Sequence, residues 1–234
     1  LLLRATYIML QQRLGLSLPT IKKVGGWSPI DEKTLAAWYQ NAVGITLNGS
    51  DVSEWADSSP NGHDMEQNTV GQQPAYSVGT LTFTSANSDN LELPALSVIS
   101  LASDFTIGIR CFPTAFNNSL LGQNQATGEF FKFTTTSQLR IKIDGSTQNI
   151  TLDSGTFGDD YLVITRVSNV LRLFQNGVQQ TATPTLAGTA DIDAIGVRHP
   201  TDTNPYAGTI KEIQIYGSSN AALTADVNSR LSTL

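Results

Sequence analysis

The chain has 234 residues, a length that single all-β sandwiches commonly occupy, and 40% of its residues are hydrophobic, which supplies one sizeable core. Its net charge of -6 argues against nucleic acid as a partner, because phosphate binding needs clustered Lys and Arg and only Lys22 and Lys23 adjoin. Its single cysteine, Cys111, excludes an intrachain disulfide framework and is expected to be a buried structural thiol.

The first 34 residues differ in character from the rest of the chain. Their apolar residues recur at intervals of three and four, which predicts one apolar face of a short helix, formed by Leu3, Tyr7, Leu10 and Leu14. An apolar helix face has to be buried, either on the rest of the same chain or on another protein. We interpret residues 1–34 as an anchoring or assembly segment that contacts other proteins or copies of this chain.

No segment of the sequence has the roughly 20 apolar residues in succession that a membrane-spanning helix needs. The opening "LLLRATYIML" carries Arg4 and precedes "QQR", so it resembles neither a spanning helix nor a complete signal peptide. We therefore expect no membrane span.

From residue 35 onward the dominant pattern has a period of two, which predicts short strands separated by turns. The segment "DFTIGIRCF" places one set of residues on a single strand face: Phe105, Ile107, Ile109 and Cys111. The segments "EFFKFTTT", "QLRIKI" and "DYLVITRV" follow the same pattern. In "VLRLFQNGVQQTA", the pair Asn176-Gly177 predicts a hairpin with a type I′ turn, which requires positive φ at both residues.

The end of the chain reads as one strand followed by one helix. In "GTIKEIQIYG", alternation predicts one face with Ile210, Glu212, Gln214 and Tyr216, opposite a face with Lys211, Ile213 and Ile215. In "ALTADVNSRLSTL", Thr224 is a candidate N-cap of a helix whose Val227 and Leu231 share a face. We expect this helix to cover the sandwich rather than to begin a second domain.

The order of short motifs resembles that of the concanavalin A-like, laminin-G-like domains of bacterial and phage surface proteins. The matching residues are Trp38, Trp55-Ala56-Asp57, Asn61-Gly62, Gln73-Pro74-Ala75-Tyr76, Phe83, Asp89 and Leu91, followed at the end of the chain by "YAGTIKEIQIYG". The chain departs from the family at Ser59-Pro60, where Ser-Gly is usual. The resemblance covers residues 35–234 and implies a two-sheet antiparallel jelly-roll sandwich, a fold that lectins, glycosidases and structural proteins share.

The stretch "SEWADSSPNGHDMEQ", residues 53–67, is rich in groups that could form a site. Calcium would require carboxylate and carbonyl oxygens, for which Asp57, Asn61, Asp64 and Asp89 are candidates, although their spacing is not that of an EF-hand. The favoured alternative is a structural turn in which Asp57 and Asn61 bond the backbone. Trp55 would then pack in the core, and Gly62 would adopt positive φ. We accordingly expect no cofactor, with calcium as the weaker alternative.

The sequence contains no recognisable catalytic pattern. It has neither the E-x-D-x-x-E strand of retaining glycosidases that this type of fold carries nor a G-x-S-x-G motif near His63 or His199, so we predict that the protein is not an enzyme. Sugar recognition would need an aromatic face with a few amide or carboxylate groups. The best candidate is the loop "VRHPTDTNPY", which offers Arg198, His199, Asp202, Asn204 and Tyr206.

Two functions follow from the resemblance and the absent motifs. The first is a non-enzymatic structural protein of a virion, either a capsid decoration or a tail-associated phage protein, in which residues 1–34 anchor the sandwich to other virion proteins. The alternative is a glycan-binding module for host attachment or adhesion, located on a bacterial cell surface or secreted, with cell-surface glycans as partners. The phage attribution rests on the resemblance alone.

Overall fold

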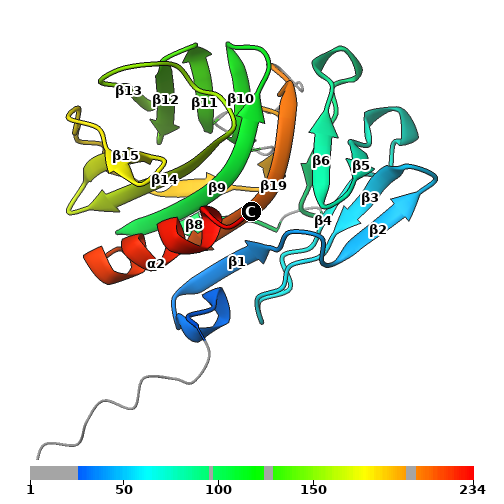
Figure 1. Ribbon diagram of the computed structural model, residues 1–234, viewed down its shortest axis with the longest axis horizontal. Helices are drawn as coiled ribbons and strands as arrows, with labels where there is room; N and C mark the ends of the chain where they lie inside the picture. Colours follow the sequence, from blue (N-terminus) through cyan, green and yellow to red (C-terminus); the bar gives the residue numbers. More distant parts are fainter. Residues whose placement is uncertain (1–25, 95–96, 124–128, 199–203) are drawn as a thin grey trace, which may run out of the picture.

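The computed structural model describes residues 26–94, 97–123, 129–198 and 204–234, and it has strands in two antiparallel layers with a helix on the outside (Figure 1). The layer that carries the helix contains, in spatial order, β1 (Leu35–Tyr39), β19 (Gly208–Tyr216), β9 (Phe105–Pro113), β14 (Asp160–Val167), β15 (Val170–Gln175) and β16 (Val178–Gln179). The other layer contains β13 (Ser146–Thr151), β12 (Gln138–Ile143), β11 (Phe130–Thr135), β10 (Asn118–Gly122), β18 (Ala194–Ile195), β7 (Leu91–Glu92), β4 (Met65–Glu66), β3 (Asp51–Trp55) and β2 (Ile45–Asn48). The predicted antiparallel sandwich is thereby confirmed.

Two strands connect the layers on one side. β6 (Thr80–Phe83) pairs with β19, and β5 (Ala75–Ser77) pairs with both β6 and β3, so hydrogen bonding continues from one layer into the other. β8 (Ile99–Leu101) and β17 (Ala190–Ile192) form a separate ribbon. Short 3-10 helices lie in the connections: η1 (Pro29–Asp31), η2 (Val70–Gln72) and η3 (Ser85–Asn87).

The strand predictions are confirmed where the alternation is regular. The four predicted inward residues of β9, from Phe105 to Cys111, all belong to the core between the layers. The predicted hairpin joins β15 to β16, and its turn residues Asn176 and Gly177 have φ values of 51° and 80°. Cys111 is 2% exposed, and burial raises the pKa of its thiol, so this side chain is the buried structural thiol that was expected.

One predicted face is wrong because of an irregularity in β19. The register against β9 shifts between Ile210 and Glu212, so the simple alternation is interrupted at Lys211. As a result Ile210 lies in the core together with Ile213 and Ile215, rather than on the face of Glu212. A β-bulge leaves no mark in an apolar–polar pattern of this length, which is why the sequence did not reveal it.

The C-terminal helix, α2, spans Ala221–Leu231 and begins earlier than the sequence predicted. Its N-cap is Asn220, whose side chain accepts a hydrogen bond from the backbone N–H of Leu223 at 2.9 Å. Thr224 lies inside the helix, and its hydroxyl donates to the carbonyl of Asn220 at 2.9 Å. The predicted shared face of Val227 and Leu231 is confirmed, because both side chains are fully buried.

α2 packs on the outer face of β9 and β14 and forms a second apolar cluster there (Figure 1). This helix cluster consists of Leu35, Trp38, Val163, Tyr216, Leu223, Val227 and Leu231. Polar bonds reinforce it, since the buried carboxylate of Glu212 accepts hydrogen bonds from Trp38 Nε1 at 3.0 Å and from Arg230 Nε at 2.5 Å. The Arg230 guanidinium also lies 4.9 Å from the Trp38 ring centroid. The helix is thus fixed to β1 and β19 by apolar and charged contacts together.

Close approach of α2 to β9 depends on Gly108. A Cβ at this position would lie 2.4 Å from Val227 Cγ1 and 3.1 Å from Leu231 Cδ1, both within the helix cluster. We expect Gly108→Ala to lower the free energy of unfolding by about 1–3 kcal/mol, as overpacking does in well-packed cores. Urea denaturation measures this change. The matched control is Gly158→Ala, which meets no atom within 4 Å and should stay within about 0.5 kcal/mol of the wild type; equal effects would contradict the packing argument.

The described part of the predicted anchoring segment, residues 26–34, contacts the sandwich. The Trp27 ring lies 6.5 Å from the ring of Tyr216, and the hydroxyls of Thr34 and Ser218 are 2.6 Å apart. The residues predicted for assembly, Leu3, Tyr7, Leu10 and Leu14, lie outside the described residues, so their role stays a prediction. Among the described residues, no helix is long and apolar enough to cross a bilayer.

Candidate functional site

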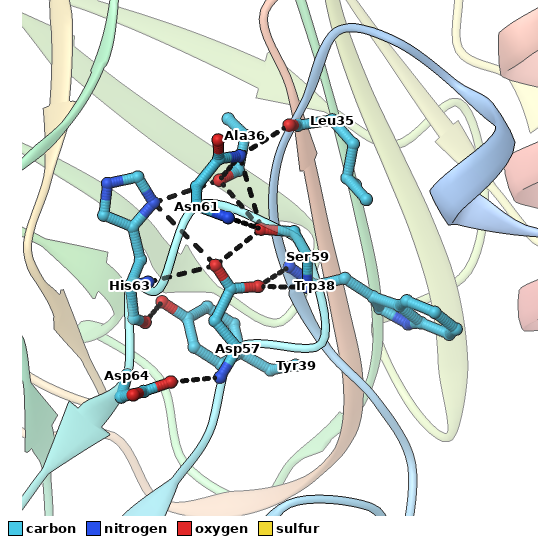
Figure 2. Close-up of polar contacts among 9 residues, drawn as sticks. All are labelled: Leu35, Ala36, Trp38, Tyr39, Asp57, Ser59, Asn61, His63 and Asp64. Carbon is cyan, nitrogen blue, oxygen red and sulfur yellow. Dashed lines mark hydrogen bonds and ion pairs between the residues drawn. The ribbon is translucent and has the colours of Figure 1, made fainter.

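The acid-rich turn after β3 is organised around the side chain of Asp57, which is fully buried (Figure 2). Its Oδ1 accepts from the backbone N–H groups of Trp38 and Ser59, both at 2.8 Å. Its Oδ2 accepts from the Ser59 hydroxyl at 2.6 Å and from the backbone N–H of His63 at 3.1 Å. Both oxygens therefore accept hydrogen bonds, one of which joins β1 to the turn while the others hold the turn itself.

The remaining polar groups of the turn are used in the same way. Asp64 Oδ1 accepts from the Asp57 backbone N–H at 2.7 Å, and Asn61 Nδ2 donates to the carbonyls of Leu35 and Ala36 at 2.8 and 2.9 Å (Figure 2). The Tyr39 hydroxyl donates to the carbonyl of His63 at 2.7 Å. Burial, and then the negative charges of Asp57 and Asp64, raise the pKa of Tyr39, so this hydroxyl remains a donor.

These contacts support the structural interpretation of the turn. Trp55 is fully buried and Gly62 has a φ of 70°, as predicted, while Asn61 bonds backbone carbonyls as a donor rather than backbone N–H groups as an acceptor. Asp89 is engaged elsewhere, since its Oδ2 accepts from the Thr84 backbone N–H at 2.7 Å. Within the described residues no group of three or more His, Cys, Asp or Glu side chains could hold a metal ion.

The loop predicted to bind sugars does not present its aromatic residue. Tyr206 is fully buried, its ring packs edge-on against Phe83 at 5.9 Å, and its hydroxyl donates to the Thr209 carbonyl at 3.3 Å. Asn204 is half-buried, and its carbonyl accepts from the Ser119 backbone N–H at 2.8 Å. His199 and Asp202 lie outside the described residues. The apolar body of a tyrosine that ends a loop packs readily into a core, and the sequence gives no sign of this.

Arg198, the first residue of that loop in the prediction, lies over the other layer of the sandwich. Its guanidinium carbon is 4.9 Å from the centroid of the Phe130 ring at the start of β11. Arg198 and Tyr206 are thus directed to different parts of the molecule, so these two predicted residues do not lie on one surface.

A groove of about 700 Å³ lies between α2 and the neighbouring strand face, within the range of small-ligand sites. We call it the α2 groove. Thr165 of β14, Arg172 and Phe174 of β15 and Gln179 of β16 line one wall, and Ser219 and Asn228 belong to the other. It combines a half-buried aromatic ring with amide and hydroxyl groups, the combination that sugar recognition requires.

Two polar atoms on the α2 wall have no hydrogen-bond partner. Ser219 Oγ and Asn228 Oδ1 are both buried, although the amide nitrogen of Asn228 donates to the Thr224 carbonyl at 2.8 Å. A buried polar group without a partner costs free energy unless a bound molecule satisfies it. The described residues that line the groove include no carboxylate, imidazole or thiol.

Sequence reasoning missed the α2 groove, although part of the signal was present. In "VLRLFQ", Leu171 and Leu173 are apolar in alternation, so Arg172 and Phe174 had to point away from the core. An aromatic residue on the outward face of a strand is expected to be covered, either by another element of the fold or by a ligand. The opposite wall comes from residues 219–228, and only the fold brings the two walls together.

No family model and no curated protein matches the chain. Solved structures match it at low sequence identity. The binding domain of Paraclostridial Mosquitocidal Protein 1 matches with a TM-score of 0.59 and 14% identity over 88% of this chain. Domain 4 of AbnA, a GH43 extracellular arabinanase from Geobacillus stearothermophilus, in complex with arabinotriose, matches with a TM-score of 0.54 and 15% identity over 84% of this chain. Trypanosoma rangeli sialidase matches with a TM-score of 0.56 and 11% identity over 98% of this chain.

The matches differ in how much of the other protein this chain covers. The chain covers 53% of the Paraclostridial structure and 38% of the sialidase, but 97% of arabinanase domain 4. At such identities the likeness concerns the fold, which is the β-sandwich that the strand patterns predicted.

Proposed function

We propose that this protein is a non-enzymatic carbohydrate-binding module that holds an oligosaccharide in the α2 groove. The observation that supports the proposal most directly is the lining of the groove, where the Phe174 ring faces a wall with two buried polar atoms that lack partners. A sugar ring has apolar C–H groups for stacking on an aromatic face and hydroxyls that satisfy amide and hydroxyl side chains.

The matched structures support the same proposal. The arabinanase structure holds arabinotriose, and this chain spans nearly all of that domain, with 97% covered. The Paraclostridial match is itself a binding domain. Because the groove lacks carboxylates among its described lining residues, binding without hydrolysis is the function that its chemistry supports.

The proposal predicts saturable binding of oligosaccharides that depends on Phe174. A glycan array identifies ligands, with arabinotriose as the first defined probe, and calorimetry measures their affinity. We expect Phe174→Ala to weaken binding about tenfold, since an aromatic contact contributes about 1 kcal/mol. Gln179→Ala, an exposed position in the same groove, should weaken binding about fivefold through loss of a hydrogen bond and cannot unfold the core.

Phe112→Ala is the matched control, because Phe112 is 42% exposed on β9 and does not line the groove. It should leave affinity unchanged. Absence of binding to any glycan, or equal losses in the Phe174 and Phe112 variants, would refute the proposal.

The structural role in a virion stays a prediction from the family resemblance, with the protein displayed on a capsid or tail. It depends on residues 1–34 as an anchoring segment, and the apolar residues of that segment lie outside the described residues. The two roles are compatible, because an anchored sandwich would display the α2 groove for attachment to cell-surface glycans.

A further inference from the structure

The outer face of the layer that does not carry α2 holds a cluster of basic side chains. In β11, Phe131 and Phe133 point into the core, so Phe130 and Lys132 point outward. The register places Arg140 of β12 directly opposite Lys132 and Lys142 opposite Phe130. Together with Arg198 these residues form what we call the basic face: Phe130, Lys132, Arg140, Lys142 and Arg198.

Contacts within the basic face hold the cations in place. Lys132 Nζ lies 5.7 Å and the Arg198 guanidinium carbon 4.9 Å from the centroid of the Phe130 ring. The negative face of an aromatic ring attracts both groups. Arg140 Nε donates to Oδ1 of Asn149, its partner on β13, at 2.8 Å. The Phe130 ring and the Asn149 amide thus help to hold cationic side chains on one surface.

Among the residues that the structure describes, no carboxylate forms an ion pair with Lys132. The residue is 7% exposed, and Arg140 likewise forms no ion pair with a described acidic side chain. Burial, followed by the charges of Arg198 and Arg140, lowers the pKa of Lys132. The neighbouring strands cover the aliphatic stem of Lys132, while its ammonium has no acidic partner among the described residues.

Ser119 adds a neutral donor to the same place. It is the cross-strand partner of Lys132 on β10, it is fully buried, and its Oγ has no hydrogen-bond partner. Ammonium, guanidinium and hydroxyl donors are what a carboxylate accepts from, and arginine can bind it through two parallel bonds. This surface thus gathers basic side chains in a chain whose net charge is -6.

We propose that the basic face is a second binding site, which takes the carboxylate of an acidic saccharide between Lys132 and Arg140. The inference rests on the proposed function only in that its ligand is a carbohydrate, and it uses none of the residues of the α2 groove.

The surroundings of the cations favour a sugar as the source of the carboxylate. Thr147, Asn149 and Thr151 of β13 are exposed beside Arg140 and Lys142, and they offer hydroxyl and amide groups to the remainder of a saccharide. A nucleic acid or other extended polyanion would be repelled by the excess of acidic residues over the rest of the chain.

The test compares acidic and neutral oligosaccharides on the full chain. A glycan array with sialylated, uronate-containing, sulfated and neutral members identifies the class, and calorimetry at two ionic strengths measures binding of the best acidic member. Lys132→Met and Arg140→Gln should each weaken acidic binding at least tenfold, and higher ionic strength should weaken it in the wild type. Binding of neutral oligosaccharides should not change.

Thermal denaturation separates this role from a structural one. Lys132→Met keeps the covered aliphatic stem and removes only the charge, so its Tm should stay the same while acidic binding is lost. Lys211→Met, a lysine of β19 away from the basic face, is the matched control and should retain binding.

The results of these experiments distinguish failure of the second site from failure of the proposed function. Acidic binding that survives Lys132→Met, or a preference for neutral glycans alone, overturns the second site while leaving the proposed function intact. Loss of acidic binding with a lowered Tm assigns Lys132 a structural role and also overturns the site. Selective binding of sulfated over carboxylated glycans would show that the anion is not a carboxylate. Failure of every glycan to bind would refute the proposed function as well.

Discussion

Replacing Arg230 by alanine should lower the free energy of unfolding by about 3 kcal/mol, the effect of removing one partner from a buried ion pair. Arg230 donates from Nε and Nη2 to the two carboxylate oxygens of Glu212 at 2.5 and 2.8 Å. The Glu212 side chain is fully buried and that of Arg230 is 24% exposed. The variant would leave the carboxylate charged in the interior, supported by neutral donors alone, such as Trp38 Nε1.

Urea denaturation of the variant measures this loss, and a double-mutant cycle with Glu212→Ala isolates the pair. Because both single variants break the same interaction, the double variant should lose clearly less than the sum of the two. Asp159→Ala is the control, since Asp159 is 61% exposed in its 2.9 Å ion pair with Arg110 and should cost about 1 kcal/mol or less. Additive losses, or an equal effect of the exposed pair, would contradict the role given to Glu212.

Asp57→Ala should be the second strongly destabilising change, by about 2–4 kcal/mol. The substitution leaves the backbone N–H groups of Trp38, Ser59 and His63 without their acceptor, and unsatisfied buried donors cost about 1–3 kcal/mol each before solvent and relaxation recover part of the loss. Asp57→Asn keeps one acceptor oxygen and should cost less. The measurement is again the midpoint and slope of urea denaturation.

A matched acid outside the turn provides the control for Asp57. Asp51 accepts from the Ser50 hydroxyl at 3.2 Å in an exposed contact, so Asp51→Ala should change the free energy of unfolding by about 0.5 kcal/mol or less. Chelation with EDTA should leave the Tm of the wild type unchanged if the turn is held by hydrogen bonds alone. A fall in Tm on chelation would revive the calcium alternative for Asp57, Asn61 and Asp64.

Local sequence rules predicted the regular parts of this fold. A strand that is buried on one face must alternate, so the inward residues from Phe105 to Cys111 could be identified directly. The Asn176-Gly177 turn was equally readable, because few residue pairs accept positive φ twice. In both cases the cause lies within a few residues of the feature itself.

The features that the sequence did not predict depend on contacts between distant residues. The bulge at Lys211 moves Ile210 into the core, and Tyr206 packs against Phe83 instead of facing solvent. The N-cap at Asn220 was missed in favour of Thr224, since both residue types can cap and only the chain direction before the helix decides between them. The two candidate sites were not predicted for the same reason, because each combines residues of several strands.

Trp38 of β1 and Glu212 of β19, which are 174 positions apart, meet in a hydrogen bond, and Arg230 of α2 binds the same carboxylate. Closing so long a loop costs chain entropy before any contact offsets it, whereas the consecutive strands β10 to β13 pair with near neighbours in the sequence. We therefore expect β11 and β12, which carry Lys132 and Arg140, to pair early during folding, and the contacts that join β1, β19 and α2 to form late. A chain on which α2 has not yet packed would then hold Lys132 and Arg140 side by side while lacking the α2 groove.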